Sequence, residues 1–298
     1  MFIIKYKKIF LALSGILMVV ALAAIAVFGL NLGIDFTGGA MMEIEYQEAR
    51  PEVQEIETAA QTVGLENVTV QPTGETGYIL RMRDLAEEEK SALDQALAFE
   101  GEYEFTEGRF SSIGPVIGEE LAQRGLIAII LVVLLIIAFV AFVFRHVSST
   151  VSSWKYGLVA IVTLVHDIVI PVGIFAALGH YIGFELDALF LTALLAILGL
   201  SVNDTIVIFD RIRENIRHKV SIHFDETVGV SLRQTFLRSF NTSFSTLIVL
   251  LSLFFLGGET TRDFALVLAV GIALGTYSSI FLAAPLLVTI EKWGRGKA

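Results

Sequence analysis

The chain has 298 residues, of which 55% are hydrophobic and only 17% charged, and its mean hydropathy is +0.73. These values exclude an ordinary soluble domain and indicate an integral membrane protein. The formal net charge of −10 disfavours nucleic acid as a partner. The absence of cysteine excludes disulfides, thiolate metal sites and a cysteine nucleophile.

Six apolar stretches are long enough to cross a bilayer as helices, which takes about 17 to 25 residues. They cover residues 9–30, 126–144, 156–179, 186–209, 240–256 and 264–290. The first follows Lys5, Lys7 and Lys8 as a signal peptide would, but its length and the lack of a small-residue cleavage site predict a retained anchor. Pro285 predicts a kink in the sixth stretch.

Lysine and arginine set the expected orientation, because cytoplasmic loops are enriched in them. With the N-terminus inside, the short outer turns hold only Arg262, and the inner loops hold most of the other basic residues of the membrane half. These are Lys5, Lys7, Lys8, Arg145, Lys155, Arg211, Arg213, Arg217, Lys219, Arg233, Lys292, Arg295 and Lys297. We therefore expect a multi-pass protein of the cytoplasmic (inner) cell membrane with both termini in the cytoplasm.

Three domains follow from this topology. Residues 1–30 form a cytoplasmic tail and the first span, and residues 31–123 form a domain outside the membrane. Residues 124–298 form a bundle of five helices with a basic cytoplasmic loop, 210–238, and a short cytoplasmic C-terminus.

The outer segment shows the order β-α-β-β-α-β. Strands are expected at 40–46, 67–71, 78–83 and 103–113, helices from Pro51 to Gly64 and over 86–99, and a turn over 72–77. This order predicts a ferredoxin-like α+β domain. The segment contains 20 of the 31 acidic residues, five basic residues and no histidine. Because its carboxylates are scattered, we expect solvated surface charge and no active site there.

A glycine-bearing stretch, 33–39, follows the first span and contains Gly33, Asp35, Gly38 and Gly39. It could be mistaken for a phosphate-binding loop, but no strand precedes it and no lysine follows it. We interpret it as the turn that passes the chain from the membrane to the outer domain.

Carboxylates inside the spans are the main functional signal. Asp204, beside Asn203, lies in the fourth span, and His166 and Asp167 lie in the third. An ionisable group at membrane depth costs roughly 2.5 to 3.5 kcal/mol on insertion scales, so such groups usually handle protons, ions or substrate. We expect a proton pathway through these residues, without cofactor, metal or catalytic residue.

Arg238 is the expected counter-charge of Asp204, since it precedes the polar face of the fifth span and keeps its charge. Protonation of Asp204 would remove the attraction and change helix packing. The alternatives are a static ion pair, or an Arg238 that extends to the lipid headgroups. His166 and Asp167 have a plain alternative too, a hydrogen bond to a neighbouring helix.

Two further patterns indicate structural roles for their residues rather than roles in binding or proton transfer. Asp210 and Arg213, like Glu214 and Arg217, are spaced i,i+3 on a helix that continues into the cytoplasm, and Arg211 lies between them. We expect a solvated helix end there rather than a binding site. Gly271 and Gly275 form a G-x-x-x-G face for close helix packing.

Four motifs together resemble a known family. They are the stretch Gly33-Ile34-Asp35-Phe36-Thr37-Gly38-Gly39, the triplet Val165-His166-Asp167, the segment from Ser201 to Asn215 that begins Ser-Val-Asn-Asp-Thr-Ile-Val, and Gly275-Thr276-Tyr277-Ser278-Ser279-Ile280. The chain resembles the SecF family, accessory subunits of the bacterial Sec protein export machinery, over nearly its whole length.

The resemblance implies half of a resistance-nodulation-division (RND) architecture, paired with SecD and associated with the SecYEG channel, with YajC as a further candidate partner. It implies a transport component rather than an enzyme, one that uses the proton-motive force to draw preproteins across the membrane at a late stage. By motif match, Asp204 falls on the family's proton-carrying aspartate and Arg238 on its functional arginine. Membrane lipid is the remaining partner.

Two other classes are considered. An RND-type exporter of lipids or drugs would share the fold but would be expected to have larger outer domains than residues 31–123 allow. An intramembrane aspartyl protease would use two carboxylates such as Asp167 and Asp204, but such enzymes characteristically place one of them in Gly-x-Gly-Asp, whereas Ser201-Val202-Asn203 precedes Asp204.

Overall fold

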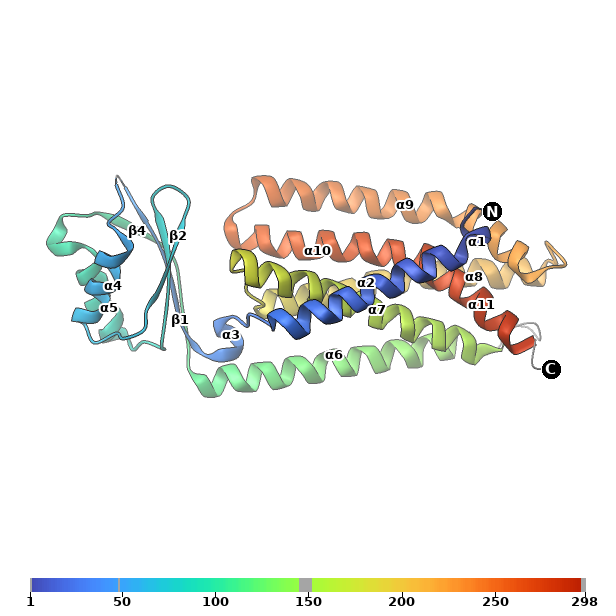
Figure 1. Cartoon of the computed structure of the whole chain (residues 1–298), viewed down its shortest axis with the longest axis horizontal. Coiled ribbons are helices and arrows are strands. Elements are labelled where there is room, and N and C mark those ends of the chain that lie inside the picture. The colour runs from blue at the N-terminus through green and yellow to red at the C-terminus, as the bar shows by residue number, and fades with distance from the viewer. Residues whose placement is uncertain (1, 48, 145–151, 296–298) are drawn as a thin grey trace. The chain divides into compact units, whose positions relative to one another are not determined.

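The computed structural model describes residues 2–47, 49–144 and 152–295. Arg145 and Lys297, both in the basic set expected to face the cytoplasm, lie outside the described residues, as do both terminal residues. The chain forms two compact units, residues 32–126 and a unit built from the N-terminal segment and everything after residue 126 (Figure 1).

The first unit is a ferredoxin-like domain, as predicted. It contains α3 (Ile34–Thr37), β1 (Gly39–Tyr46), α4 (Val53–Thr62), β2 (Thr69–Thr73), β3 (Gly77–Met82), α5 (Glu87–Leu97), a short 3₁₀ helix η1 (Phe99–Gly101) and β4 (Phe105–Ile113). The sheet order is β2-β3-β1-β4 with antiparallel neighbours, and α4 and α5 cover one face (Figure 1).

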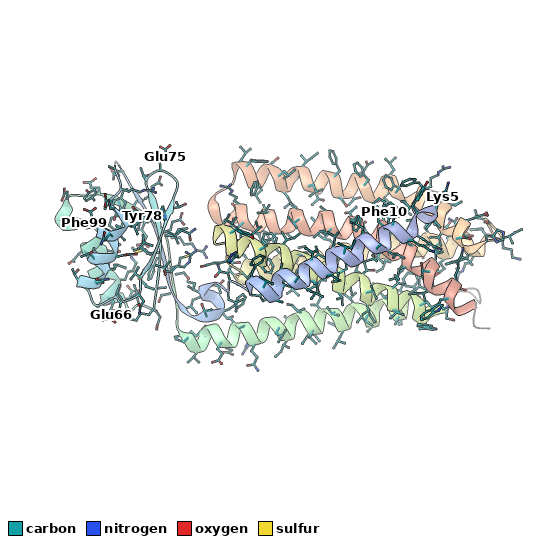
Figure 2. The ribbon with its side chains drawn as sticks, in the orientation of Figure 1. Lys5, Phe10, Glu66, Glu75, Tyr78 and Phe99 are labelled. Atoms are coloured by element: carbon teal, nitrogen blue, oxygen red, sulfur yellow. The ribbon has the colours of Figure 1, made fainter. Side chains whose placement is uncertain are left out.

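Alternating side chains build the core between this sheet and its helices. Met42 and Ile44 from β1 and Leu80 from β3 are fully buried against Leu93 of α5. The acidic side chains lie around the surface, and Glu66 and Glu75 are at opposite ends of the domain (Figure 2). Such a distribution fits solvated surface charge.

The element boundaries of this domain differ from the sequence prediction by one or two residues, and two of these differences have a clear physical reason. α4 begins at Val53 rather than Pro51, because Glu52 caps the helix and its backbone N–H donates to Glu55 at 2.8 Å. Pro72 belongs to β2 and not to the following turn. β2 is an edge strand, where the missing N–H of a proline is tolerated.

Gly38 and Gly39 form the junction between α3 and β1, and both have positive φ, +74° and +120°. A Cβ on Gly38 would lie 2.7 Å from the Cα of Pro115, and one on Gly39 would lie 2.8 Å from the carbonyl oxygen of Met82. Backbone conformation and close approach therefore both require glycine at these two positions.

We predict that acid loosens the N-terminus of α5 through Glu89. Arg83 forms a two-pronged hydrogen bond with this carboxylate and the N–H of Ala86 donates to it, which holds the pKa of Glu89 down at about 2. Because the folded pKa lies below the unfolded value, the contribution is present above about pH 4.3 and is lost as pH falls towards 2. Amide hydrogen exchange of α5, followed across this pH range and corrected for intrinsic rates, measures the loss of this contribution. Glu89→Gln should weaken protection at neutral pH, and the exposed Glu88→Gln should not.

The second unit is a helical bundle. It contains α1 (Phe2–Lys5), α2 (Lys7–Phe28), the main part of α6 (Pro115–Val143), α7 (Ser153–Ile182), α8 (Ala188–Arg217), α9 (Phe224–Leu256), α10 (Glu259–Tyr277), the π-helix η2 (Ser278–Ala283) and α11 (Ala284–Arg295). Within the described residues, six helical segments are long and apolar enough to span a membrane. The predicted spans are confirmed.

The segment 210–238, expected as a basic cytoplasmic loop into which the fourth helix continues, is a helical hairpin: α8 continues to Arg217 as expected, and α9 already begins at Phe224. Its helices pack through small hydroxyl residues of α9, since Thr227, Ser231 and Thr235 are buried. Buried polar residues of this kind lower the hydropathy of a segment without weakening its packing. The sequence pattern therefore did not indicate that α9 begins as early as Phe224.

The sixth span changes its winding before Pro285, which lacks an N–H and whose ring would meet the carbonyl of Phe281 in a regular α-helix. The chain is π-helical over Ser278–Ala283 and returns to α-helix at Ala284. This wider turn places Ser278 and Ser279 in the buried centre of the bundle.

Candidate functional site: two carboxylates in the bundle

Asp167 of α7 is the centre of a fully buried polar cluster. Its Oδ2 accepts hydrogen bonds from Ser201 of α8 and, at 2.9 Å, from Ser278 of η2. Its Oδ1 lies 2.9 Å from Nδ1 of His166. All four side chains are buried, so one carboxylate ties three segments of the bundle together.

Further hydroxyl groups extend this cluster along α8 and η2. Thr205 and Ser279 are hydrogen-bonded at 2.9 Å, and Ser279 donates to the carbonyl oxygen of Ser201 at 3.3 Å. On the other side, the ring of His166 stacks on Tyr277, whose hydroxyl lies 3.1 Å from that of Ser14 in α2. Four segments thus meet around the third-span motif.

Asp204 lies elsewhere, on the half-buried face of α8. Together with the exposed Asn203 it lines a cavity of about 50 Å³ between α8, α9 and α10. The hydroxyl side chains of Thr242, Ser243, Thr246 and Thr276 also line this cavity, as does Ser201. The expected polar face of the fifth span consists of Thr242, Ser243, Ser245 and Thr246. Three of these residues share the cavity with Asp204, whereas Ser245 is exposed.

Arg238 is exposed on α9 and acts on Asp204 electrostatically. No ion pair within 4.0 Å joins the two side chains in the described part of the chain. The hydroxyl of Ser239, next to Arg238, is buried without a hydrogen-bond partner within 3.5 Å among the described residues, yet it is close enough to act on the same carboxylate. Arg238, the expected counter-charge, therefore acts on Asp204 without a direct ion pair.

The cytoplasmic motif forms the α8–α9 hairpin. Asp210 pairs with Arg213 at 2.7 Å, as predicted. Glu214 bonds Arg211 at 2.6 Å and not Arg217, because Arg211 is held by a second bond to Gln234 of α9 at 2.8 Å. These contacts fasten α8 to α9.

The glycine motifs have packing roles in this structure. Gly271 of α10 lies against α8, where a Cβ would meet the side chain of Ile197 at 2.0 Å, and a Cβ on Gly275 would lie 3.0 Å from that of Ser201. In the outer unit, Gly33 is the N-cap of α3 and Asp35 lies in its first turn. The G-x-x-x-G face is thus used within the chain.

Sequence reasoning placed Asp204 and Asp167 correctly in neighbouring spans but missed how Ser201 and Ser278 serve Asp167. Both serines stood in the recognised motifs, and the signal lay in their spacing. Ser201 is three positions before Asp204 on one helix face, and Ser278 follows Gly275, where α10 closely approaches α8.

Six spanning helices, a ferredoxin-like domain between the first two, and carboxylates inside the bundle define a membrane transport component. The described residues contain no group of three or more side chains suited to hold a metal ion.

The chain belongs to the SecD/SecF family of protein export membrane proteins. Residues 94–293 match the family described as "Protein export membrane protein SecD/SecF, C-terminal", and residues 23–49 match the "SecD/SecF GG Motif", which contains Gly38 and Gly39. Protein translocase subunit SecF of Thermobaculum terrenum is 41% identical over 97% of this chain and 93% of its own length. The SecF subunits of Anaerolinea thermophila and Haemophilus influenzae are 36% and 35% identical over 97% and 94% of this chain and 94% and 82% of their own.

Solved structures give the same assignment. The crystal structure of SecDF from Thermus thermophilus superposes with a TM-score of 0.83 at 32% identity, over 97% of this chain. A super-membrane-facing form of SecDF gives 0.67 at 31% identity, over 99%. The chain spans 38% and 39% of those two chains.

Proposed function

We propose that this chain is the SecF-type subunit of a bacterial Sec protein translocase and promotes late export of preproteins with a SecD-type partner. The observation that carries this is 41% identity to a SecF subunit across 93% of that subunit's length. The chain spans 38% of a SecDF chain, and a SecD-type partner is proposed to supply the remaining spans. The exporter alternative has no comparable relative among these matches.

The proposed placement is the inner membrane, with both termini in the cytoplasm and the ferredoxin-like unit outside. The distribution of lysine and arginine supports it. In this position the acidic outer domain would meet preproteins as they leave the SecYEG channel. SecYEG, YajC and membrane lipid are proposed as further contacts.

The driving force is proposed to be the proton gradient, acting at Asp204. A proton that enters from outside would neutralise this side chain and cancel its attraction to Arg238 until it leaves inside. Moving one charge through 100 mV supplies about 2.3 kcal/mol, which shifts a two-state equilibrium by tens of fold. Repacking of α8 against α9 would then move the outer domain.

Partner capture tests the proposal. We expect the tagged full chain, expressed in its own host and purified in mild detergent, to retain a six-span SecD-type protein in equal amount. Depleting the chain should slow late export only while the proton gradient is intact, so adding an ionophore should remove the difference between depleted and undepleted cells. A chain that purifies alone, or a defect that persists without the gradient, contradicts the proposal.

A further inference from the structure

Ser201 stands between the two carboxylates of the bundle. Its hydroxyl donates to Oδ2 of the fully buried Asp167. The same residue lines the cavity on which Asp204 lies. Because the two are three positions apart on α8, their side chains share one face of the helix. Among the described residues that line the cavity, Ser201 is the one whose side chain is hydrogen-bonded to Asp167.

We propose that Ser201 relays a proton between the Asp204 cavity and Asp167, so that proton transport is coupled to the buried hydrogen bonds that join α7, α8 and η2. The proposal rests on the proton-driven function proposed above and adds a residue and a direction to it. Asp204 is half-buried and exchanges protons with the surroundings. Asp167 is fully buried and receives its proton through the hydroxyl group of Ser201.

The transfer is balanced without any group beyond water. The Ser201 hydroxyl passes its proton along the existing hydrogen bond to Asp167, and its oxygen takes a proton from a water molecule in the cavity. That water recovers a proton from the Asp204 carboxyl. Serine and water end neutral, and one proton has moved from Asp204 to Asp167.

The cavity provides what this step needs. Its volume of about 50 Å³ accommodates one water molecule, which requires two to four polar partners. Hydroxyl groups on its wall meet this requirement, including the pair Ser243 and Thr276, which are hydrogen-bonded at 2.6 Å.

Arrival of the proton would change what holds the bundle together. Asp167 faces His166 from its own helix, Ser201 from α8 and Ser278 from η2, while Asp204 faces Arg238 and Ser239 from α9. A carboxylate accepts at both oxygens, whereas a neutral carboxyl must donate one hydrogen bond itself. Protonated Asp167 would therefore release or reverse one of its three bonds, and a proton at Oδ2 would change a bond that joins α7 to α8 or to η2.

A purely structural role for Ser201 is the competing explanation, and Ser278 supplies a matched control. Both serines are buried, and both donate to the same oxygen of Asp167. Only Ser201 of this pair lines the cavity. A structural role predicts similar effects of Ser201→Ala and Ser278→Ala, whereas the relay predicts a difference.

The test uses the full chain in complex with its SecD-type partner and infrared difference spectroscopy after a pH jump. Asp167→Asn and Asp204→Asn assign the two carboxyl bands. We expect Ser201→Ala to slow the appearance of the Asp167 band by at least about tenfold, a threshold below the roughly hundredfold or more that a positioned proton-transfer group contributes, and to leave the Asp204 band in place. Ser278→Ala should stay within about twofold of the unmodified complex.

Equal rates in the two serine variants would overturn the relay. If Ser201→Ala does not assemble with the partner, Asp204→Asn decides: the relay predicts a delayed Asp167 band, and an independently titrating Asp167 keeps its original rate. Gradient-driven export by the Asp204→Asn variant distinguishes failure of the proposed function from failure of the relay alone. Normal export by that variant refutes the proposed function, while lost export with equal serine rates refutes only the relay.

Discussion

Asp204→Asn is expected to abolish the part of preprotein export that depends on the proton gradient, while the complex still assembles. Asparagine has nearly the same volume and keeps a polar group on the cavity wall, but it cannot carry a proton. The variant therefore removes the coupling of roughly 2.3 kcal/mol per 100 mV without opening a cavity. The measurement is the export rate of a secreted reporter with and without an ionophore.

Asp210→Asn is the matched control for this variant. It lies on the same helix, is exposed, and loses only a surface ion pair with Arg213, which is worth about 0 to 1 kcal/mol. We expect near-normal export from it under both conditions. Equal gradient dependence of the Asp204 variant and the unmodified chain would exclude Asp204 as the proton carrier.

The sequence predicted the architecture where a local pattern carries it. The six spans follow from hydropathy and length, and the order of strands and helices predicted the ferredoxin-like domain, whose sheet has the order β2-β3-β1-β4. The start of α9 at Phe224 was not predictable in this way, because its first turns bury Thr227 and Ser231 against α8 and read as a polar loop. Hydropathy measures the preference for lipid, whereas this helix is held by contacts with another helix.

The site was predictable to a similar extent. A carboxylate in an apolar span is visible in sequence, so Asp204 and Asp167 could be singled out. Their partners depend on the register in which α7, α8 and η2 pack, which no local pattern encodes. Spacing suggested a direct pair with Arg238, but the exposed guanidinium acts on Asp204 from beyond 4.0 Å. The hydrogen bonds from Ser201 and Ser278 to Asp167 were visible only once the helices were assembled.

Gly173→Ala is expected to lower the stability of the bundle more than any other single methyl group added to α7. A Cβ at this position would lie 2.6 Å from both Cα and Cβ of the buried Ala21 in α2 and 2.7 Å from its carbonyl oxygen. Backbone atoms cannot rotate away, so α2 must move off α7. Overpacking of this kind costs about 1 to 3 kcal/mol.

Gly157→Ala on the same helix separates this clash from the intrinsic effect of replacing glycine. A Cβ at Gly157 meets nothing within 4 Å, so the substitution adds only the helix preference of alanine, about 0.5 to 1 kcal/mol in favour of folding. Thermal unfolding in detergent should therefore place the Gly173 variant below the unmodified chain and the Gly157 variant at or above it. Because α2 has few buried residues and its main packing partner is α7, the Gly173 variant should also expose α2 to protease at its Lys7–Lys8 end. Equal melting temperatures for the two variants would show that α2 is not held against α7 at Gly173.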